Sequence, residues 1–309
     1  MKQNQPLVSV PVITYNSSAT VIETLDSVFN QTYPNIELIV SDDCSTDDTI
    51  ELCRNWIEKN KGRFVGAKIL TVEKNSGTSA NCNRAEDACK GEWVKEIAGD
   101  DVLLPNCITD FVEYVQEHPE SVYVFARIKV FGASEEECQR YEKEVFDPAF
   151  FQLTSEQQLE KLIFDRNYIP SATCFYNRQK KDECGVRNDE RIPLLEDWPK
   201  WINLLKAGVK FNFVDKVLVK YRISGISTTG LYSDVYYRTC RLFKYYYLYP
   251  EWMLKNQDEA IRRMVDEDYC EYIDLRDSLI GVRESKAYRL GKFILRPFSW
   301  MKRTIIGKK

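Results

Sequence analysis

The adjacent carboxylates Asp100 and Asp101 are the side chains of this sequence best suited to do chemistry. They follow an apolar run at 93–97 and Gly99, so they stand where a buried strand ends. Neighbouring acids repel each other, and burial penalises their charged forms. A divalent cation that carries a substrate diphosphate would offset both penalties. The alternative interpretation is a polar turn with solvated acids.

A phosphate ligand would need such a cation here, because the sequence offers no backbone cradle for phosphate. It contains neither the glycine triplet of dinucleotide-binding folds nor a P-loop lysine. Mg²⁺ typically takes one or two protein carboxylates and leaves its other positions to phosphate oxygens and water. We therefore expect Asp100 and Asp101 to bind metal appreciably only together with the diphosphate.

Two further polar clusters could contact a nucleotide. Thr14-Tyr15-Asn16 could place an aromatic ring against a flat base, or it could simply end a strand. Asp42 could accept a hydrogen bond from an imide N–H such as that of uracil. Alternatively, Asp42, Asp43 and Ser45 could cap the next helix. We expect Ser45 or Asp47 to be the cap, which would leave Asp42 free.

Glu196 and Asp197 form a second acidic pair, directly before a predicted helix. An acid at a helix N-terminus is stabilised as the anion, so the pair could be a cap. It could also supply a general base that takes a proton from an attacking hydroxyl. The neighbouring residues do not decide between these two interpretations.

These clusters need a scaffold that brings them together. Strand-like apolar runs at 7–13, 36–40, 65–72 and 93–97 each lead into a polar loop. Helical patterns follow these loops, and this alternation predicts a mostly parallel sheet with helices on both faces. In such sheets ligands bind outside the carboxyl ends of the strands, so we expect the four loops to meet at one edge.

The remaining pattern continues the mixed architecture before it becomes helical. We expect helices at 106–117 and 200–206, mainly helical structure at 134–164 with a break near Pro148, strands at 122–130, 169–176 and 210–222, and helices after residue 230.

Composition excludes several classes of protein. The chain has 309 residues, enough for one large domain with an appendage or for two domains. It has ten cysteines but no Cys-x-x-Cys, and His118 is its one histidine, so no Cys/His metal cluster is expected. We expect reduced thiols in a cytoplasmic protein without a signal peptide. No apolar run approaches the roughly 18 residues of a membrane span.

Charge is distributed unevenly along the chain. Residues 286–309 hold eight Lys/Arg and no Asp/Glu, so the rest holds 35 Lys/Arg against 47 Asp/Glu, a net charge of −12. An acidic body argues against nucleic-acid binding. Apolar residues recur at helical spacing in the tail, which suits an interfacial helix on an anionic membrane. A helix packed on the catalytic domain, or a contact between two copies of the chain, is the alternative.

Taken together, five ordered motifs resemble those of the family 2 glycosyltransferases, which have the GT-A fold. The motifs are Thr14-Tyr15-Asn16; Asp42-Asp43-Cys44-Ser45-Thr46-Asp47; Asn75-Ser76-Gly77 with Asn83; Gly99-Asp100-Asp101; and Glu196-Asp197-Trp198 with Tyr221-Arg222. The resemblance covers about residues 5–228. It implies a GT-A catalytic domain at 1–228, with a nucleotide-binding half at 1–101 and an acceptor half at 102–228. A helical region at 229–309 with the basic tail would follow.

The resemblance also implies roles for single residues. Asp197 would be the base of an inverting displacement, and Asp101 would ligate Mg²⁺ or Mn²⁺. Asp100 would approach the ribose or the metal. The nucleotide would contact Thr14, Tyr15, Asn16, Asp42, Asn75, Gly77 and Asn83, with Tyr15 against the base and Asp42 on its N3–H. Phosphate or acceptor contacts would come from Glu196, Trp198 and Arg222.

The implied reaction moves a sugar from a nucleotide sugar, with UDP-sugars expected, to a hydroxyl group of a glycan or lipid-linked saccharide. Bacterial surface-polysaccharide enzymes of this family commonly use lipid-linked acceptors, which would suit a peripheral contact of residues 286–309 with the inner face of the cell membrane. The sugar, the acceptor and the oligomeric state are not set by the sequence.

Three positions depart from the usual family pattern. Ile13 replaces a proline, Cys82 replaces an arginine and Ser224 replaces a histidine. The alternatives are a sugar nucleotidyltransferase, which would want a glycine-rich basic first loop, and a catalytically inactive binding subunit. The presence of Asp101 and Asp197 argues against the inactive subunit.

Overall fold

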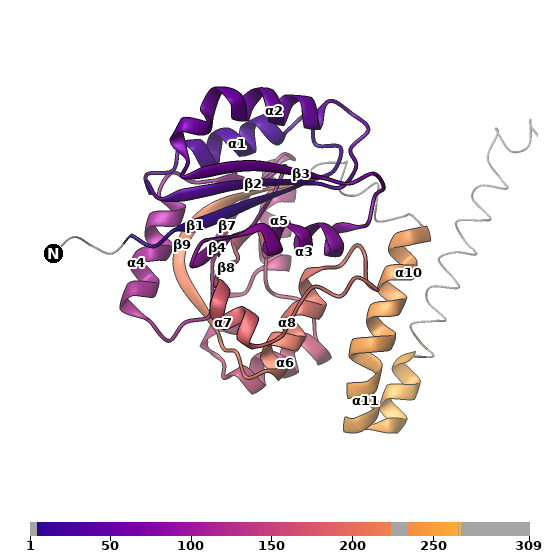
Figure 1. Ribbon diagram of the computed structural model, residues 1–309. Helices are drawn as coiled ribbons and strands as arrows, with labels where there is room; N and C mark the ends of the chain where they lie inside the picture. Colours follow the sequence, from indigo (N-terminus) through magenta and orange to yellow (C-terminus); the bar gives the residue numbers. More distant parts are fainter. Residues whose placement is uncertain (1–4, 224–233, 265, 267–309) are drawn as a thin grey trace, which may run out of the picture. The chain divides into compact units, whose positions relative to one another are not determined.

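The computed structural model describes residues 5–223, 234–264 and 266 (Figure 1). The chain divides into two compact units, residues 1–248 and 249–309. The basic tail predicted at 286–309 lies outside the described residues, as does the point at residue 228 where the catalytic domain is predicted to end. In the described part of the chain, no helix has both the length and the apolar character that a membrane span requires.

One mixed sheet of nine strands forms the centre of the first unit. The strands are β1 (Val8–Thr14), β2 (Ile36–Asp42), β3 (Gly66–Thr71), β4 (Trp93–Lys95), β5 (Ile97–Ala98), β6 (Val102–Leu103), β7 (Tyr123–Phe131), β8 (Phe175–Asn177) and β9 (Phe211–Arg222). Their order is β3-β2-β1-β4-β8-β7-β9-β6, with β5 beside β1. Strand β8 runs antiparallel to β4 and β7, and β6 runs antiparallel to β9, whereas the other pairs are parallel. The prediction of a mostly parallel sheet is confirmed.

Helices lie on both faces of this sheet, as predicted. Figure 1 shows α1 and α2 on one face of strands β1 to β3 and α3 on the other. The α-helices are α1 (Val21–Phe29), α2 (Thr49–Asn60), α3 (Thr78–Ala88), α4 (Cys107–Glu117), α5 (Glu135–Val145), α6 (Ser155–Phe164), α7 (Arg178–Glu183), α8 (Asp197–Lys206), α10 (Asp234–Phe243) and α11 (Tyr249–Lys255). Short 3₁₀ turns are η1 (Lys61–Arg63), η2 (Pro148–Gln152) and η3 (Ser171–Thr173), and η4 (Lys244–Leu248) is a π-helix.

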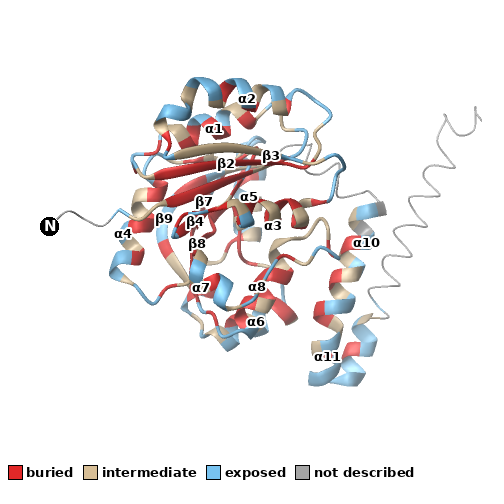
Figure 2. Ribbon diagram, in the orientation of Figure 1, coloured by how far each residue is buried: buried red, intermediate tan, exposed pale blue. Residues whose placement is uncertain are grey.

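The core lies along the central strands, where Figure 2 shows continuous burial, while α1 and α2 turn exposed faces outward. Phe175 of β8 is stacked between two other aromatic rings, 5.1 Å from Trp93 and 4.9 Å from Phe111 between ring centroids. The fully buried Trp201 of α8 packs edge-on against Phe125 of β7 at 5.2 Å. This contact fixes α8, and with it the acidic pair at the start of α8, against the sheet.

One predicted strand is only partly correct. Residues 171–173 form the turn η3, and the strand predicted at 169–176 begins at Phe175. Pro170 has no N–H to give to a sheet. The carbonyl oxygen of Ala172 accepts a hydrogen bond from the buried Lys95 ammonium at 2.7 Å, so this segment bonds to a side chain instead of a neighbouring strand.

Candidate active site

The carboxyl ends of β1, β2, β3 and β5 meet at one edge of the sheet. In the parallel register, Asp42 lies between Thr14 and Thr71, and Ile13 lies beside Ala98. The polar loops that follow these four strands therefore start side by side. This is the convergence that the strand–loop–helix pattern predicts.

Asp42 is completely buried, and its carboxylate is engaged by its neighbours. Oδ2 accepts hydrogen bonds from the hydroxyl groups of Thr14 at 2.9 Å and Ser45 at 2.5 Å, and Oδ1 accepts from the Ser45 N–H at 2.8 Å. The expectation that the loop leaves Asp42 free is therefore wrong, because Ser45 folds back onto Asp42. Asp47 does bond the start of α2, through the Thr49 N–H at 3.1 Å.

Asp43, which the sequence suggested only as a cap, ties the loop after β2 to the loop after β3. Oδ2 accepts from the N–H groups of Ser76 at 3.0 Å and Gly77 at 2.7 Å. Oδ1 accepts from Arg84 of α3 at 3.1 Å. The family usually has an arginine at the position of Cys82, and Arg84 lies two residues after that position. Arg84 could have been found from its charge, because it is the single basic residue between Lys74 and Lys90.

Tyr15 differs from the two predicted site residues beside it. It is 50% exposed, so much of this residue is open to solvent at the sheet edge. Thr14 is buried against Asp42. Asn16 has a left-handed φ of 50°, and its side-chain oxygen accepts the Thr46 N–H at 2.8 Å. Thr14 and Asn16 therefore shape the turn that presents Tyr15.

The loop after β3 is held from the acceptor half of the chain. The exposed Asn75 accepts the Gly77 N–H at 3.2 Å. Gly77 has a φ of 90°, and a Cβ at this position would lie 2.7 Å from Pro193 Cβ. Only glycine meets both conditions, the left-handed backbone and the close approach.

Asn83 is also buried, and it contacts the same segment of the acceptor half. Its Oδ1 accepts the Asn188 N–H at 3.0 Å, and its Nδ2 donates to Glu190 Oε1 at 2.9 Å. The amide of Asn83 therefore anchors the stretch that leads into α8. Its predicted contact with a nucleotide stays a prediction.

The structure brings Asp101 together with Arg222, a contact that the sequence did not predict. Asp101 is 2% exposed, and its Oδ1 accepts the Arg222 N–H at 2.8 Å. The Arg222 guanidinium donates to the Asp100 carbonyl oxygen at 2.8 Å and pairs with Glu23 of α1. It also lies over the ring of Phe131, 4.3 Å from the centroid.

The electrostatic penalty expected for two adjacent acids is present. Burial, with the charge of Asp100 added to it, raises the pKa of Asp101 to about 8, while the Arg222 N–H and the Lys95 ammonium act in the opposite direction. Burial also raises the pKa of Asp100. Lys95 is completely buried, and its ammonium donates to the carbonyl oxygen of Glu96 at 2.6 Å. Protein cations thus offset the penalty only in part.

A row of polar residues along α1 and its two ends holds the acidic loop in place, and it was not predicted from the sequence. Thr24 and Ser27 lie within α1, Thr20 is its N-cap, and Gln31 lies two residues after its last residue; they are spaced four, three and four residues apart, which is helical spacing. They bond successive backbone groups of residues 99–104: Thr20 Oγ1 to Gly99 O at 2.8 Å, Thr24 Oγ1 to Asp101 O at 2.8 Å, Leu103 N to Ser27 Oγ at 3.1 Å, and Gln31 Nε2 to Leu104 O at 2.8 Å. The sequence signal that could have indicated this row is the helical spacing of its polar residues.

The acidic loop suits a metal that brings other ligands with it. Among the described residues, no group of three or more His, Cys, Asp or Glu side chains could hold a metal ion alone. Asp100 and Asp101 supply carboxylate oxygens, which Mg²⁺ and Mn²⁺ favour, and leave positions for phosphate oxygens and water. A cation there would also relieve the repulsion between the two buried acids.

Asp197 opens α8, and both of its carboxylate oxygens accept hydrogen bonds. Oδ1 accepts the Trp198 N–H at 2.7 Å, and Oδ2 accepts from Asn167 Nδ2 at 2.8 Å. Glu196 is the N-cap residue but makes no side-chain capping bond. Burial raises the pKa of Asp197, and burial together with the Asp197 charge raises the pKa of Glu196 to about 8. Carboxylates that titrate closer to neutral pH suit acid–base chemistry.

A buried network of charges lies behind this pair. Lys200 of α8 is 2% exposed, and its ammonium lies 3.5 Å from Glu86 and 3.6 Å from Glu96. The other carboxylate oxygen of Glu86 accepts from Lys181 at 2.6 Å. Burial alone would lower the pKa of Lys200, but the charges of Glu96 and Glu86 raise it well above its usual value. Lys200 therefore remains an ammonium ion near Asp197.

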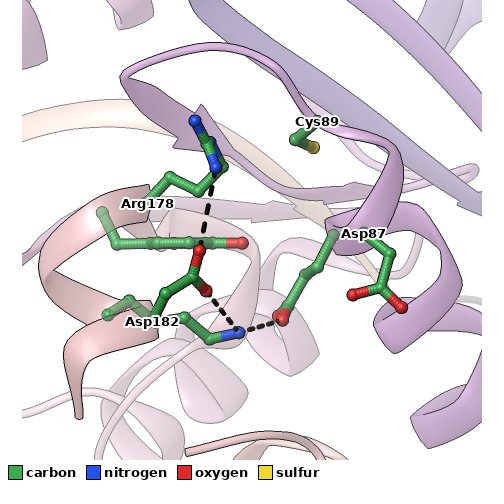
Figure 3. Close-up of a pocket in the computed structure, with 7 residues that line it drawn as sticks. Asp87, Cys89, Arg178 and Asp182 are labelled. Carbon is green, nitrogen blue, oxygen red and sulfur yellow. Dashed lines mark hydrogen bonds and ion pairs between the residues drawn. The ribbon is translucent and has the colours of Figure 1, made fainter. Parts of the chain in front are cut away.

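Glu86 and Lys181 also line a cavity of about 140 Å³. Figure 3 shows Asp87 and Cys89, from the end of α3, across this cavity from Arg178 and Asp182 of α7. Its lining comes from α3, β8 and α7, not from the loops at the sheet edge. Cations and carboxylates pair with each other around it, so this cavity does not compete with the acidic loop as a site for a charged substrate.

Comparisons with known proteins show what the chain is similar to. A family model described as glycosyl transferase family 2 matches residues 9–185, more than half of the chain. The chain is 27% identical to an uncharacterized glycosyltransferase of Haemophilus influenzae over 244 residues, 78% of this chain and 73% of the relative. It is 26% identical to the putative teichuronic acid biosynthesis glycosyltransferase TuaG of Bacillus subtilis over 219 residues, 71% of this chain and 80% of TuaG.

Among solved structures, the fold is similar to that of S. aureus TarS 1–349 in complex with UDP-GlcNAc. The TM-score is 0.60 at 22% sequence identity, and the match covers 76% of this chain and 65% of the TarS chain. At this level of identity, the similarity establishes the GT-A fold and leaves the substrate open.

Proposed function

Because this chain belongs to glycosyl transferase family 2, we propose that it transfers a sugar from a UDP-sugar to a saccharide hydroxyl, with inversion at the anomeric carbon. The observation that carries the proposal is the buried Asp101 beside Asp100 at the sheet edge, next to the loop that presents Tyr15. The complex of TarS with UDP-GlcNAc supports a UDP-sugar donor. The name of TuaG supports a role in polysaccharide biosynthesis.

The donor would lie across the sheet edge. The exposed Tyr15 would contact the base, and Asp101 with Asp100 would hold Mg²⁺ or Mn²⁺ on the diphosphate. Such a cation neutralises the charge that grows on the leaving group. Asp42 would act through the loop that it ties to β1, because its carboxylate has no exposed surface.

The acceptor would lie at the start of α8. Asp197 would take the proton of the attacking hydroxyl group, since a sugar hydroxyl is too weakly acidic to ionise at neutral pH. Glu196 and Trp198 flank Asp197 and would contact the acceptor. We propose a glycan or a lipid-linked saccharide as that acceptor, with residues 286–309 in contact with an anionic membrane.

The test is release of UDP from UDP-GlcNAc, UDP-glucose and UDP-galactose, measured with Mn²⁺, with Mg²⁺ and with EDTA. We expect metal-dependent release by the wild type and at least about 100-fold less by Asp101→Asn, since removal of one transition-state charge contact typically has that effect. Asp215→Asn is the matched control, because Asp215 is an exposed acid that pairs with Arg127.

A second measurement separates an enzyme from an inactive binding subunit. UDP with Mn²⁺ should raise the melting temperature of the wild type and of Asp197→Asn, because a ligand stabilises the state that binds it. Asp197→Asn should nevertheless lose UDP release. Stabilisation by UDP without release from any of these UDP-sugars would contradict catalysis and favour the binding subunit.

A further inference from the structure

Asn167 lies between α6 and η3, and its side chain reaches the Asp197 carboxylate. Its Nδ2 donates to Asp197 Oδ2 at 2.8 Å, and its Oδ1 accepts the Ile169 N–H at 3.1 Å. An amide side chain can be turned so that either its oxygen or its nitrogen faces a partner. A backbone N–H can only donate, so the bond from Ile169 fixes the oxygen end and directs the NH₂ group at Asp197.

The two donors to Asp197 come from separate parts of the fold. The Trp198 N–H belongs to α8, the helix that Asp197 itself begins. Asn167 belongs to the segment that follows α6. The Trp198 indole N–H donates to the carbonyl oxygen of Leu162 in α6 at 2.9 Å, so α8 is bonded to α6 as well. The carboxylate is thus held from both sides. A carboxylate offers about four lone-pair sites, so these donors leave room for a substrate hydroxyl group.

We propose that Asn167 is a positioning residue for sugar transfer, which holds the Asp197 carboxylate in the orientation that accepts the proton of the acceptor hydroxyl. This inference rests on the proposed function, in which Asp197 is the base. A carboxylate that loses the Asn167 bond can rotate away from the acceptor. Misplacement of a reacting group by about 1 Å can lower a rate by about 100-fold.

The same bond affects the pH dependence of the reaction. Glu196 before α8, Lys200 of α8 and Tyr236 of α10 each interact electrostatically with Asp197. Burial raises the pKa of Asp197, while the donors from Trp198 and Asn167 and the charge of Lys200 lower it. Removal of the Asn167 donor therefore raises this pKa further. Because the base must be deprotonated, the acidic limb of the rate profile then moves to higher pH.

The experiment compares Asn167→Leu, Asn167→Asp and Asp197→Asn with wild type. Leucine has a similar size but no donor, whereas aspartate keeps an acceptor for the Ile169 N–H and replaces the donor with a second acid. Asn212→Leu is the matched control, since Asn212 is a partly buried asparagine whose amide donates to Ser121 at 3.1 Å. The readouts are melting temperature, KM and kcat for UDP release with Mn²⁺, and kcat/KM between about pH 5 and 9.

We expect Asn167→Leu to lower kcat by about 10- to 100-fold with a KM for the UDP-sugar within about twofold of wild type. Its acidic limb should move to higher pH, and that of Asn167→Asp should move at least as far. Asn212→Leu should leave kcat and the pH profile unchanged. A merely structural role for Asn167 would lower the melting temperature without moving the acidic limb.

The outcomes distinguish two errors. If Asp197→Asn is inactive but both Asn167 variants keep the wild-type kcat and pH profile, the role of Asn167 is overturned and the proposed function stands. If Asp197→Asn keeps its activity, the assignment of the base is wrong, and the inference about Asn167 falls with it.

Discussion

Thr24 offers the most direct test of how the acidic loop is positioned. It is completely buried on α1, and its hydroxyl group donates to the carbonyl oxygen of Asp101 at 2.8 Å. Valine has nearly the same shape but no donor. Thr24→Val therefore removes this bond without opening a cavity, and it leaves a buried carbonyl group unsatisfied.

The expected size of the effect follows from that orphaned carbonyl group of Asp101. A buried polar group left without its partner destabilises a protein by about 1–3 kcal/mol. For a unit of this size, a loss near 2 kcal/mol lowers the melting temperature by roughly 4–8 °C. The loop also gains freedom at Asp101, so the stabilisation by UDP with Mn²⁺ should be smaller than in wild type.

The assay is thermal unfolding with and without UDP and Mn²⁺. Thr239→Val is the matched control, because Thr239 is equally buried but its hydroxyl group donates within its own helix, to the carbonyl oxygen of Val235 at 2.7 Å. The control should lose less stability and keep the full response to UDP and Mn²⁺. A Thr24→Val protein that melts like wild type and responds equally to UDP and Mn²⁺ would refute the role of the polar row.

Three further predictions test other parts of the molecule. Gly77→Ala should lower the melting temperature, because alanine is strained at a φ of 90° and its Cβ would lie 2.7 Å from Pro193; Gly62→Ala, where a Cβ meets open space, should not. Glu86→Gln should lower the free energy of unfolding at pH 7 by about 3–5 kcal/mol, because it leaves buried cations without their partner. Burial alone would raise the pKa of Glu86, but Lys200 and Lys181 lower it, so the stabilisation is present at neutral pH and is lost as the pH falls through the lowered pKa. Urea unfolding at pH 7 and pH 3 should therefore show the difference shrinking in acid. Deletion of residues 286–309 should abolish binding to anionic vesicles at low salt, and unchanged binding would contradict the membrane interpretation.

The sequence predicted the sheet well because its signals are local. Apolar runs such as those of β1 and β2 are short, and each is followed directly by its polar loop. Parallel pairing then brings the loops together without further information. The strand predicted at 169–176 failed for a reason that no local pattern contains: Lys95, far away in the sequence, bonds the carbonyl oxygen of Ala172.

The sequence named candidate site residues, but it did not indicate which groups most of them bond. Ser45 could either cap α2 or form a turn with Asp42, three residues before it. Asp42 is buried at the end of β2 and needs a hydrogen-bond donor, which favours the turn. The partners of Thr24 and Asn167 are tens of residues away. The polar row along α1 was visible in the sequence, but it did not indicate which backbone groups it bonds.

The contacts between the nucleotide-binding half and the acceptor half show a structural role for the buried acid Asp43. Asp43 holds the loop of Gly77, and Gly77 in turn packs on Pro193, four residues before the proposed base. Ser79 adds a bond to the carbonyl oxygen of Ile192 at 2.6 Å. The donor loops and the start of α8 thus share one framework, and a change at Asp43 should disturb both. A framework held in this way loses less conformational freedom when a charged donor binds. The buried carboxylate of Asp43 therefore favours binding by organising the site before the substrate arrives.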